Sequence, residues 1–345
     1  MQAFIIDKYG THSGRIAEVA EPQMQDDDVL IRVHAAGVNA LDNKIRAGEF
    51  KLLLPYRLPL TLGNDVAGVV VRTGSAVHAF RPGDEVYARP DQERIGSFAQ
   101  FIAVKESALA LKPDNLDFLQ AASVPLVSLT AWQALVDVAK LRKGQKIFIH
   151  AGSGGVGTIA IQLAKHLGAF VATTTSEKNV QWVKTLGADV VIDYKTQSFE
   201  NGDRDYDVVI NSLGTDVLEK SLSILKPGGK LISISGPPTP EFATEQGLPW
   251  YLRQIMRLMS YRIRKKAKRQ GVKYSFLFMR ASGRQLSEIT ALIESGVIRP
   301  VIDQVFPFEQ TAEALTYVES GRTKGKVVID LGIATVPVDL NRQIG

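Results

Sequence analysis

Three glycines with a fixed spacing are the residues in this chain that most directly indicate a ligand. They complete a G-x-G-x-x-G pattern in AGSGGVG, between an apolar run and a segment of helical spacing. In such a turn the first glycine permits the bend, the second lets a pyrophosphate approach the backbone, and the third lets helix and strand pack closely. The helix then offers free N–H groups to phosphates. The pattern predicts a dinucleotide site at Gly152, Ser153, Gly154, Gly155, Val156 and Gly157.

The end of the next predicted strand bears on which dinucleotide is bound. NAD-binding turns usually carry an acidic residue about 20 positions beyond the glycines. Here that position is threonine, within Thr173-Thr174-Thr175-Ser176-Glu177-Lys178. A carboxylate would repel a 2′-phosphate, whereas Thr175, Ser176 and Lys178 could bind one. We therefore expect NADPH, although Glu177 could instead face the ribose of NADH.

Polar residues also follow the fourth and fifth predicted strands of this region. The carboxyl ends of parallel strands form the edge at which ligands bind. We expect nicotinamide contacts at this edge from Asn211, Ser212, Leu213, Ser233 and Ser235.

The elements that position these residues alternate between strand and helix from Leu119 onward. We predict strands at 146–150, 169–174, 190–193, 206–210, 230–235 and 326–330, and helices at 157–167, 177–186 and 284–296. Pro227-Gly228-Gly229 is expected to end a helix before the strand at 230–235. The alternation predicts an α/β fold with a doubly wound parallel sheet.

The first 120 residues have a different pattern. Turn signals such as Arg81-Pro82-Gly83-Asp84 separate short apolar runs, and no helical period is sustained before Leu119. The runs predict strands at 29–34, 66–71, 85–88 and 99–104. We expect an irregular β domain that precedes the nucleotide fold.

Composition narrows the class of protein. The 345 residues are 45% hydrophobic and 22% charged, a globular composition with enough length for two domains. No apolar run reaches the roughly 18 residues of a membrane span, and the N-terminus lacks a signal-peptide pattern. The absence of cysteine excludes disulfides, thiolate zinc sites and a cysteine nucleophile. We expect a cytoplasmic protein.

The net charge of +5 comes from one segment. Residues 250–270 hold eight basic residues and no acidic one, so the rest of the chain is net acidic. Apolar residues are interleaved with these cations. The segment could be a solvated helix packed on its own domain, a peripheral contact with an anionic membrane, a cover over the active-site mouth or a site for an acidic partner. No motif indicates nucleic-acid binding.

Several motifs in a fixed order connect this chain to a known family. They are GVNALDNKIRAG at 37–48, LGNDVAGVV at 62–70, RPGDEVYA at 81–88, GSFAQFIAV at 96–104, AGSGGVG at 151–157 and GKVVIDL at 325–331. The chain resembles the zinc-independent quinone oxidoreductases of the medium-chain dehydrogenase/reductase superfamily. Residues 274–283 and 298–315 look most like the branch with reticulon-interacting mitochondrial proteins and chloroplast-envelope enone reductases.

The resemblance implies a domain arrangement and excludes a metal. It implies a GroES-like catalytic domain at 1–120, completed by 282–345, and a Rossmann NADP-binding domain at 121–281 that includes the basic segment. Zinc-dependent relatives place a cysteine where Asn39 lies, and G-H-E where Gly63-Asn64-Asp65 lies. Without an imidazole or a thiolate, the side chains of Asn39, Asn64 and Asp65 would bind zinc poorly, and we predict no metal. Reduction of a conjugated C=C depends less on a Lewis acid than alcohol oxidation does.

The resemblance also implies roles for individual residues. It places Asn39, Asp42 and Lys44 in the cleft beneath the nicotinamide. Asn39 or Lys44 would then donate a hydrogen bond to a carbonyl oxygen that becomes an enolate, and Asp42 would orient its neighbours. Quinone reductases often have tyrosine at the Lys44 position, and the enone-reductase branch tends to have lysine. Alternatively, the three residues only cap a loop and a helix start. The cofactor contacts implied by resemblance are Lys178, Tyr194, Phe276, Phe278 and Lys326.

We therefore expect an NADPH-dependent reductase of quinones or α,β-unsaturated carbonyls. One-electron quinone reduction is an alternative chemistry. A further alternative is a non-catalytic NADPH-binding protein that docks through 250–270. By analogy with the family, a homodimer could form if the strand at 230–235 pairs two sheets edge to edge.

Overall fold

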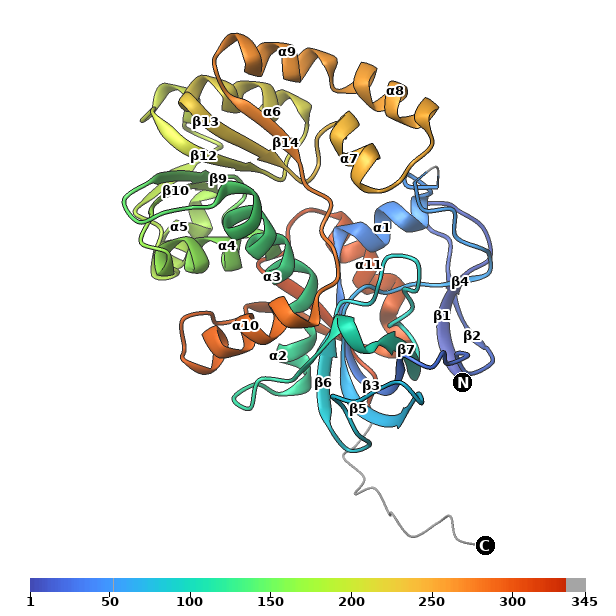
Figure 1. Cartoon of the computed structure of the whole chain (residues 1–345). Coiled ribbons are helices and arrows are strands. Elements are labelled where there is room, and N and C mark those ends of the chain that lie inside the picture. Colours follow the sequence, from blue (N-terminus) through green and yellow to red (C-terminus); the bar gives the residue numbers. More distant parts are fainter. Residues whose placement is uncertain (52, 333–345) are drawn as a thin grey trace, which may run out of the picture. The chain divides into compact units, whose positions relative to one another are not determined.

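The computed structural model describes residues 1–51 and 53–332. The chain divides into two compact units (Figure 1). Of the described residues, unit 1 comprises those within 1–126, 280–296 and 300–332, and unit 2 comprises 127–279 and 297–299. The predicted boundaries at 120 and 282 therefore lie six and two residues from those of the structure. The final part of the predicted catalytic domain, 333–345, lies outside the described residues.

Unit 1 is built on two sheets. The larger has the order β15-β16-β3-β5-β6-β8, with β7 also paired to β3, and the smaller has the order β2-β1-β4. Its strands are β1 Gln2–Ile6, β2 Arg15–Glu18, β3 Asp28–Val38, β4 Leu60–Thr61, β5 Val66–Thr73, β6 Glu85–Ala88, β7 Phe101–Lys105, β8 Leu109–Leu111, β15 Ile302–Pro307 and β16 Lys326–Asp330. Its helices are α1 Ala40–Ala47, α2 Phe118–Ala122, α10 Gly283–Glu294 and α11 Thr311–Glu319. The four strands predicted before residue 120 are all present.

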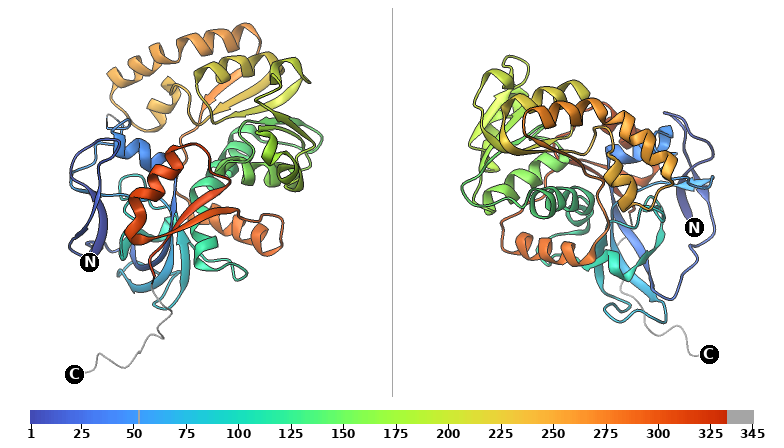
Figure 2. Two further views of the ribbon diagram at one scale, coloured as in Figure 1. Left: turned by 180° about the vertical axis from the view of Figure 1, so that it is seen from behind. Right: turned by 45° about the horizontal axis from the view of Figure 1, so that its top comes forward.

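The C-terminal part of the chain completes the larger sheet of unit 1. Strand β16 pairs antiparallel with β3, so that Val327 lies opposite Val38. Helix α11 buries Ala314 and Leu315 in the same apolar core as Ile31 and Val33 of β3. Figure 2 shows α11 beside β15 and β16. This return of the chain brings Lys326 to the end of β3, directly before the segment that holds Asn39.

Helix α1 corrects the expectation that no helix precedes Leu119. It begins after Asn39 and ends at Gly48, which adopts the left-handed φ of 82°. The backbone N–H of Asn39 donates to the Asp42 carboxylate at 2.7 Å, which is one half of a capping box. The helix has only eight residues, so its apolar period is too short to stand out in the sequence.

Unit 2 is a Rossmann-like unit with six parallel strands in the order β11-β10-β9-β12-β13-β14. The strands are β9 Lys146–Ile149, β10 Phe170–Thr175, β11 Val190–Asp193, β12 Tyr206–Asn211, β13 Leu225–Ser233 and β14 Lys273–Phe276. The helices are α3 Pro125–Trp132, α4 Gly155–His166, α5 Val180–Thr185, α6 Thr215–Ser221, α7 Pro240–Glu245, α8 Trp250–Met259 and α9 Tyr261–Arg269, with a π-helix over Gln133–Ala139. This architecture and the GroES-like β unit confirm the predicted fold class.

Helices cover both faces of this sheet. In Figure 1, α4 and α5 lie on one face, and α6 and α9 lie on the other. Leu218 of α6 and Ile263 and Ala267 of α9 share an apolar core with Phe148 of β9 and Val209 of β12. A doubly wound sheet of this kind has its carboxyl strand ends free for ligands.

Two details of the predicted sheet were wrong. Pro227-Gly228-Gly229 does not break a helix before the fifth strand. It lies within β13, at the point where the register of the pairing with β12 shifts. The strand predicted at 230–235 is also not an edge strand, because β13 pairs with β12 on one side and β14 on the other. The edge strands of this sheet are β11 and β14. No helix of the described part of the chain is long and apolar enough to cross a membrane.

Candidate active site

The glycine-rich turn between β9 and α4 has the geometry that the sequence predicts. A Cβ on Gly152 would lie 2.2 Å from Thr173 Oγ1, and one on Gly157 would lie 2.3 Å from the carbonyl oxygen of Ala151. Both positions therefore require glycine. At Gly154 a Cβ would lie 3.4 Å from the carbonyl oxygen of Ala151, an ordinary contact, so the fold itself does not require glycine there.

The N-terminus of α4 is free to bind an anion. The helix has 12 residues, begins at Gly155 after the N-cap Gly154, and has no side-chain cap. The first-turn N–H groups of Gly155, Val156 and Gly157 have no intrahelical acceptor, as at every helix start. These donors and the helix dipole fit a pyrophosphate. The residues present therefore fit the dinucleotide that the pattern indicates.

Residues at the end of β10 meet the glycine-rich turn. Thr175 is buried, and its hydroxyl donates to Ser153 Oγ at 2.9 Å. Ser176 accepts a hydrogen bond from Asn179 at 3.4 Å, and Lys178 and Glu177 are exposed. Tyr194 is 60% exposed, and its backbone N–H donates to the carbonyl of Thr175 at 3.1 Å. The predicted contacts for a 2′-phosphate are thus gathered at one strand end.

A second group of predicted residues meets at the ends of β12 and β13. Asn211 Oδ1 accepts hydrogen bonds from Ser233 Oγ at 3.1 Å and Ser235 Oγ at 3.3 Å. Ser235 also donates to the carbonyl oxygen of Leu213 at 2.6 Å, and Ser212 Oγ lies 3.5 Å from the carbonyl of His150. The Nδ2 of Asn211 is buried without a hydrogen-bond partner. An orphaned buried donor at a carboxyl strand end fits a site that binds a polar ligand.

Phe276 and Phe278 form an aromatic group with Phe242 of α7. Their ring centroids lie 5.2 and 5.7 Å from that of Phe242. Phe276 ends β14 opposite Ser233 of β13, which places it beside the Asn211 group. The structure therefore gives both rings a packing role, and contact with a nicotinamide stays a prediction.

In unit 1, the ammonium of Lys326 is at the centre of a buried polar cluster. It donates to Asp65 Oδ2 at 3.1 Å, to the carbonyl of Val38 at 3.0 Å and to Asn39 Oδ1. Lys326 is 5% exposed and Asp65 is fully buried. The other oxygen of Asp65 accepts from the backbone N–H of Leu126 at 2.7 Å. All three donors of the lysine are therefore committed within unit 1, and its predicted contact with a cofactor stays a prediction.

Asn39 also has its donors committed in this cluster. Its Nδ2 donates to Asp65 at 2.8 Å and to the carbonyl of Gly37 at 3.3 Å. In the structure Asn39 thus holds Asp65 and Lys326 together, rather than presenting an amide N–H. Donation to a substrate oxygen stays a prediction that requires one of these bonds to be exchanged.

Asp42 extends the cluster toward Asn64 and Arg89. Its carboxylate accepts from Asn64 Nδ2 at 2.7 Å, and Arg89 lies 3.4 Å from Asn64 Oδ1. Asp42 is fully buried, and this burial raises its pKa to about 6. Burial likewise lowers the pKa of Arg89. Asp42 therefore bonds to the backbone of Asn39 and to the side chain of Asn64, and its role in orienting catalytic neighbours stays a prediction.

Lys44 lies apart from this cluster on the outer side of α1. Its side chain is 42% exposed and its ammonium lies 3.8 Å from Glu49. An exposed ion pair of this length is weak, so the ammonium can exchange its partner. Of the three residues predicted to be catalytic, Lys44 is the one whose polar atoms are available to a ligand.

The residues at the expected metal position do not fit zinc. Within residues 1–51 and 53–332 no group of three or more His, Cys, Asp or Glu could hold a metal ion. Asn39, Asn64 and Asp65 stand where zinc-dependent relatives have their ligands, and the ammonium of Lys326 contacts two of the three. The oxygen atoms of Asn39 and Asp65 are therefore bound to the ammonium of Lys326.

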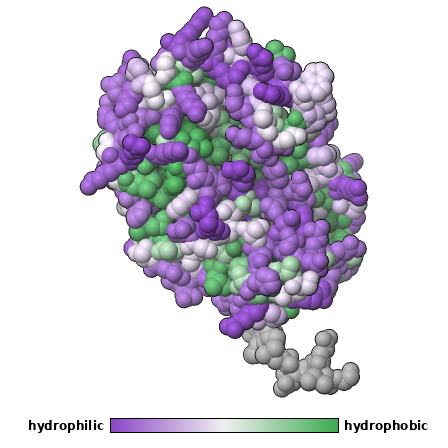
Figure 3. Space-filling model, in the orientation of Figure 1, coloured by the Kyte–Doolittle hydropathy of each residue, from purple (hydrophilic) through white to green (hydrophobic). Residues whose placement is uncertain are grey.

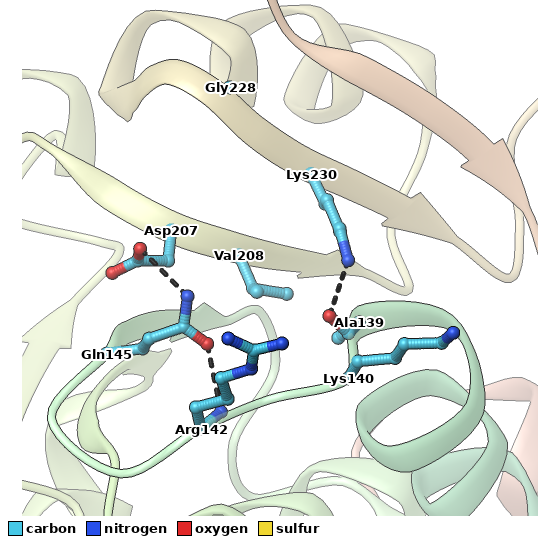
Figure 4. Close-up of a pocket in the computed structure, with 8 residues that line it drawn as sticks. All are labelled: Ala139, Lys140, Arg142, Gln145, Asp207, Val208, Gly228 and Lys230. Atoms are coloured by element: carbon cyan, nitrogen blue, oxygen red, sulfur yellow. Dashed lines mark hydrogen bonds between the residues drawn. The ribbon is translucent and has the colours of Figure 1, made fainter.

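A cavity in unit 2 lies at the opposite edge of the sheet from the glycine-rich turn (Figure 4). It measures about 200 Å³ and is lined by Ala139, Lys140, Arg142, Gln145, Asp207, Val208, Gly228 and Lys230. Lys230 donates to the carbonyl of Ala139 at 2.6 Å, and Gln145 donates to Asp207 at 3.1 Å. Four lining residues, from Ala139 to Gln145, precede β9, and the other four lie in β12 and β13 before their carboxyl ends, where ligands of this fold bind. The cavity is therefore separate from the predicted nucleotide site.

The sequence did not identify three members of the unit 1 cluster. Asn64 and Asp65 figured only as replaced zinc ligands, and Arg89 was not among the candidates. The signal for Asp65 was its place in LGNDVAGVV, directly before an apolar strand. Arg89 follows β6 and carries no local signal, because its role depends on burial beside residues far away in the sequence.

The two units define a dehydrogenase fold, with a GroES-like unit and a dinucleotide-binding unit. Comparison with known families agrees: residues 25–114 match the alcohol dehydrogenase GroES-like domain, and residues 186–329 match the zinc-binding dehydrogenase family.

Individual relatives narrow the group further. The chain is 36% identical over 342 residues to the NADPH-dependent alkenal/one oxidoreductase, chloroplastic, of Arabidopsis thaliana, covering 95% of this chain and 79% of that protein. It is 33% identical over 359 residues to the NAD(P)H oxidoreductase RTN4IP1, mitochondrial, of Danio rerio, covering 96% and 91%. Among solved structures, the quinone oxidoreductase from Coxiella burnetii matches with a TM-score of 0.85 and 30% identity, covering 96% and 99%. The chain belongs to the medium-chain dehydrogenase/reductase superfamily, and it is an oxidoreductase.

Proposed function

We propose that this protein is an NADPH-dependent reductase that transfers a hydride to quinones or α,β-unsaturated carbonyl compounds without zinc. The observation that carries the proposal is the end of β10, where Thr175 replaces the acidic residue of NAD-binding turns and Lys178 is exposed beside it. The relatives support the substrate class, because their names specify alkenals, enones or quinones.

The chain's own residues have defined tasks in such a reaction. When bound, NADPH supplies a hydride from C4 of its nicotinamide to an electron-poor carbon of the acceptor. The N–H groups of Gly155, Val156 and Gly157 would hold its pyrophosphate, and the buried Nδ2 of Asn211 would orient a polar group. The ammonium of Lys44 stabilises the negative charge that develops on the acceptor oxygen. A proton from Lys44 or from water then completes the reduced product.

A spectrophotometric panel tests this proposal. Oxidation of NADPH and of NADH is followed with a quinone, a short enone, a long-chain enal and a saturated aldehyde. We expect turnover of the quinone or the enones with NADPH and none of the saturated aldehyde, which has no conjugated carbon. Preference for NADH would contradict the cofactor assignment.

The alternative is a non-catalytic protein that binds NADPH and docks through 250–270. The same panel separates the two, because such a protein would bind NADPH tightly and oxidise none with any acceptor. A one-electron reductase would instead generate semiquinone, detectable by spin resonance, from the quinone alone.

We further propose two partners and a location. The basic segment 250–270 would make a peripheral contact with a membrane. Two copies of the chain would pair edge to edge through β14, the edge strand beside β13, as a homodimer. We propose a cytoplasmic location, which the absence of cysteine suits.

A further inference from the structure

Helix α8 has an apolar stripe that faces away from its own domain. Tyr251, Ile255, Leu258 and Met259 follow the spacing i, i+4, i+7 and i+8, and they are 51%, 48%, 78% and 58% exposed. Met256, which lies off this stripe on the same helix, is buried. Of the eleven large hydrophobic residues exposed in the described part of the chain, six lie between Trp250 and Tyr261. Such a concentration on a folded surface indicates a site of contact.

Helix α9 continues from this stripe with a basic outer surface. Its inward residues Ile263 and Ala267 are anchored in the core beneath β13 and β14. The eight basic residues of the two helices are Arg253, Arg257, Arg262, Arg264, Lys265, Lys266, Lys268 and Arg269. The upper part of Figure 3, where α8 and α9 lie, accordingly shows hydrophilic residues interspersed with hydrophobic ones.

Most of these cations have no carboxylate partner. Arg262 and Lys266 pair with Glu219 at 2.9 and 3.3 Å, and Arg264 pairs with Glu241 at 3.8 Å. Within residues 1–51 and 53–332 no ion pair involves the other five. Segment 250–270 therefore keeps a positive field next to the apolar stripe.

The apolar stripe of α8 and the cations beside it together favour one kind of partner for this surface. A second copy of the chain would bring eight further cations to the same face, so like charges would oppose pairing there. A nucleic acid would supply phosphates but no apolar phase for Ile255 and Leu258. An anionic bilayer supplies both, and Trp250, Tyr251 and Tyr261 are the aromatic types enriched at its interface.

We propose that α8 and α9 together form a peripheral docking surface for an anionic lipid bilayer. The stripe of α8 inserts among the headgroups, and the cations of α9 lie near the lipid phosphates. This inference specifies the membrane contact proposed above and does not depend on the reductase activity.

Vesicle flotation of the full-length protein tests the proposal. Vesicles of phosphatidylcholine alone are compared with vesicles that also contain phosphatidylglycerol, at about 0.1 M and about 0.5 M salt. We expect binding to the anionic vesicles at the lower salt, at least tenfold weaker binding at the higher salt, and a blue shift of fluorescence that Trp250→Phe removes.

Matched variants separate the two components. Ile255→Gln with Leu258→Gln removes the stripe, and Lys265→Gln with Lys268→Gln and Arg269→Gln removes charge. Each set should weaken anionic-vesicle binding at least tenfold while leaving turnover in solution unchanged. As controls, Leu111→Gln removes a leucine of unit 1 that is 55% exposed, and Lys143→Gln with Lys184→Gln and Arg322→Gln removes the same charge elsewhere.

Three results would overturn the proposal. The first is that the protein does not bind anionic vesicles at the lower salt, and the second is that the stripe and charge variants bind these vesicles as tightly as the control variants do. The third is a dimer, seen by light scattering, that Leu258→Gln dissociates, together with no binding to any vesicle. The last would assign the surface to protein contact. Turnover measured in the same preparations tests the reductase proposal separately.

Discussion

The ammonium nitrogen of Lys326 lies 3.1 Å from a carboxylate oxygen of Asp65, and both side chains are buried in unit 1. Residues 261 positions apart thus form an ion pair that joins β16 to the segment before β5. Asn39 bonds to both partners and is also the residue from which α1 begins. The pair therefore fixes the start of the helix that carries Asp42 and Lys44.

Removing the lysine should destabilise the protein strongly. In Lys326→Met the Asp65 carboxylate stays buried without its counter-charge, which typically costs about 3–5 kcal/mol. Urea unfolding followed by circular dichroism measures this loss. Lys105→Met breaks an exposed pair with Asp27 and should cost at most about 1 kcal/mol. Equal losses of unfolding free energy in the two variants would show that the buried pair stabilises unit 1 no more than an exposed pair does.

Lys178 should determine the preference between the two cofactors. In Lys178→Ala, kcat/KM with NADPH should fall about tenfold or more, because a charge-assisted contact to the 2′-phosphate is lost. The value with NADH, which lacks that phosphate, should not change. Lys184→Ala removes another exposed lysine just beyond it and should leave both values unchanged. A parallel fall with both cofactors would place Lys178 outside the phosphate contact.

Lys44 should affect the chemical step rather than binding. In Lys44→Met we expect kcat to fall about tenfold to a hundredfold, with little change in the KM for NADPH, because stabilisation of the developing oxyanion is lost. Lys51→Met, an exposed lysine just after α1, is the control. An unchanged kcat in Lys44→Met would contradict a role for Lys44 in stabilising the oxyanion or in delivering the proton.

The sequence predicts those parts of the structure that are encoded by residues close together in the chain. Gly152, Gly154 and Gly157 lie in one turn, so their spacing predicts the strand, the turn and the helix together. The Lys326–Asp65 pair depends on the C-terminal chain returning to pair with β3, and no local pattern encodes that register. Helix α1 was missed because eight residues give little periodicity, although Asn39 and Asp42 carry a capping signal. Pro227-Gly228-Gly229 resembles a turn but lies in a strand, because its pairing with β12 is irregular there.

A buried histidine should make the protein sensitive to acid. His150 bonds to Ser221 Oγ at 2.8 Å, and its burial lowers its pKa to about 3. The unfolded chain binds a proton near pH 6.5 and the folded chain does not, so this contribution is full above about pH 6.5 and declines toward pH 3. The loss by pH 5 should be about 2 kcal/mol.

Unfolding free energies at about pH 7.5 and pH 5 measure this effect. His150→Gln should reduce the difference between the two pH values, even if its stability is lower at both. His166→Gln, which alters an exposed histidine of α4, should retain the full difference. The same pH dependence in all three proteins would show that other groups control acid unfolding.

Transfer of a labelled hydride tests the central claim most directly. NADPH deuterated at the transferable C4 position is incubated with the enzyme and an enone that the panel shows to be reduced, and the product is analysed by NMR. Direct hydride transfer predicts one deuterium, bound to the carbon β to the carbonyl, and a solvent-derived proton at the α-carbon. A product without deuterium, or with deuterium at the carbonyl carbon, would contradict the assignment of this protein as a conjugate reductase.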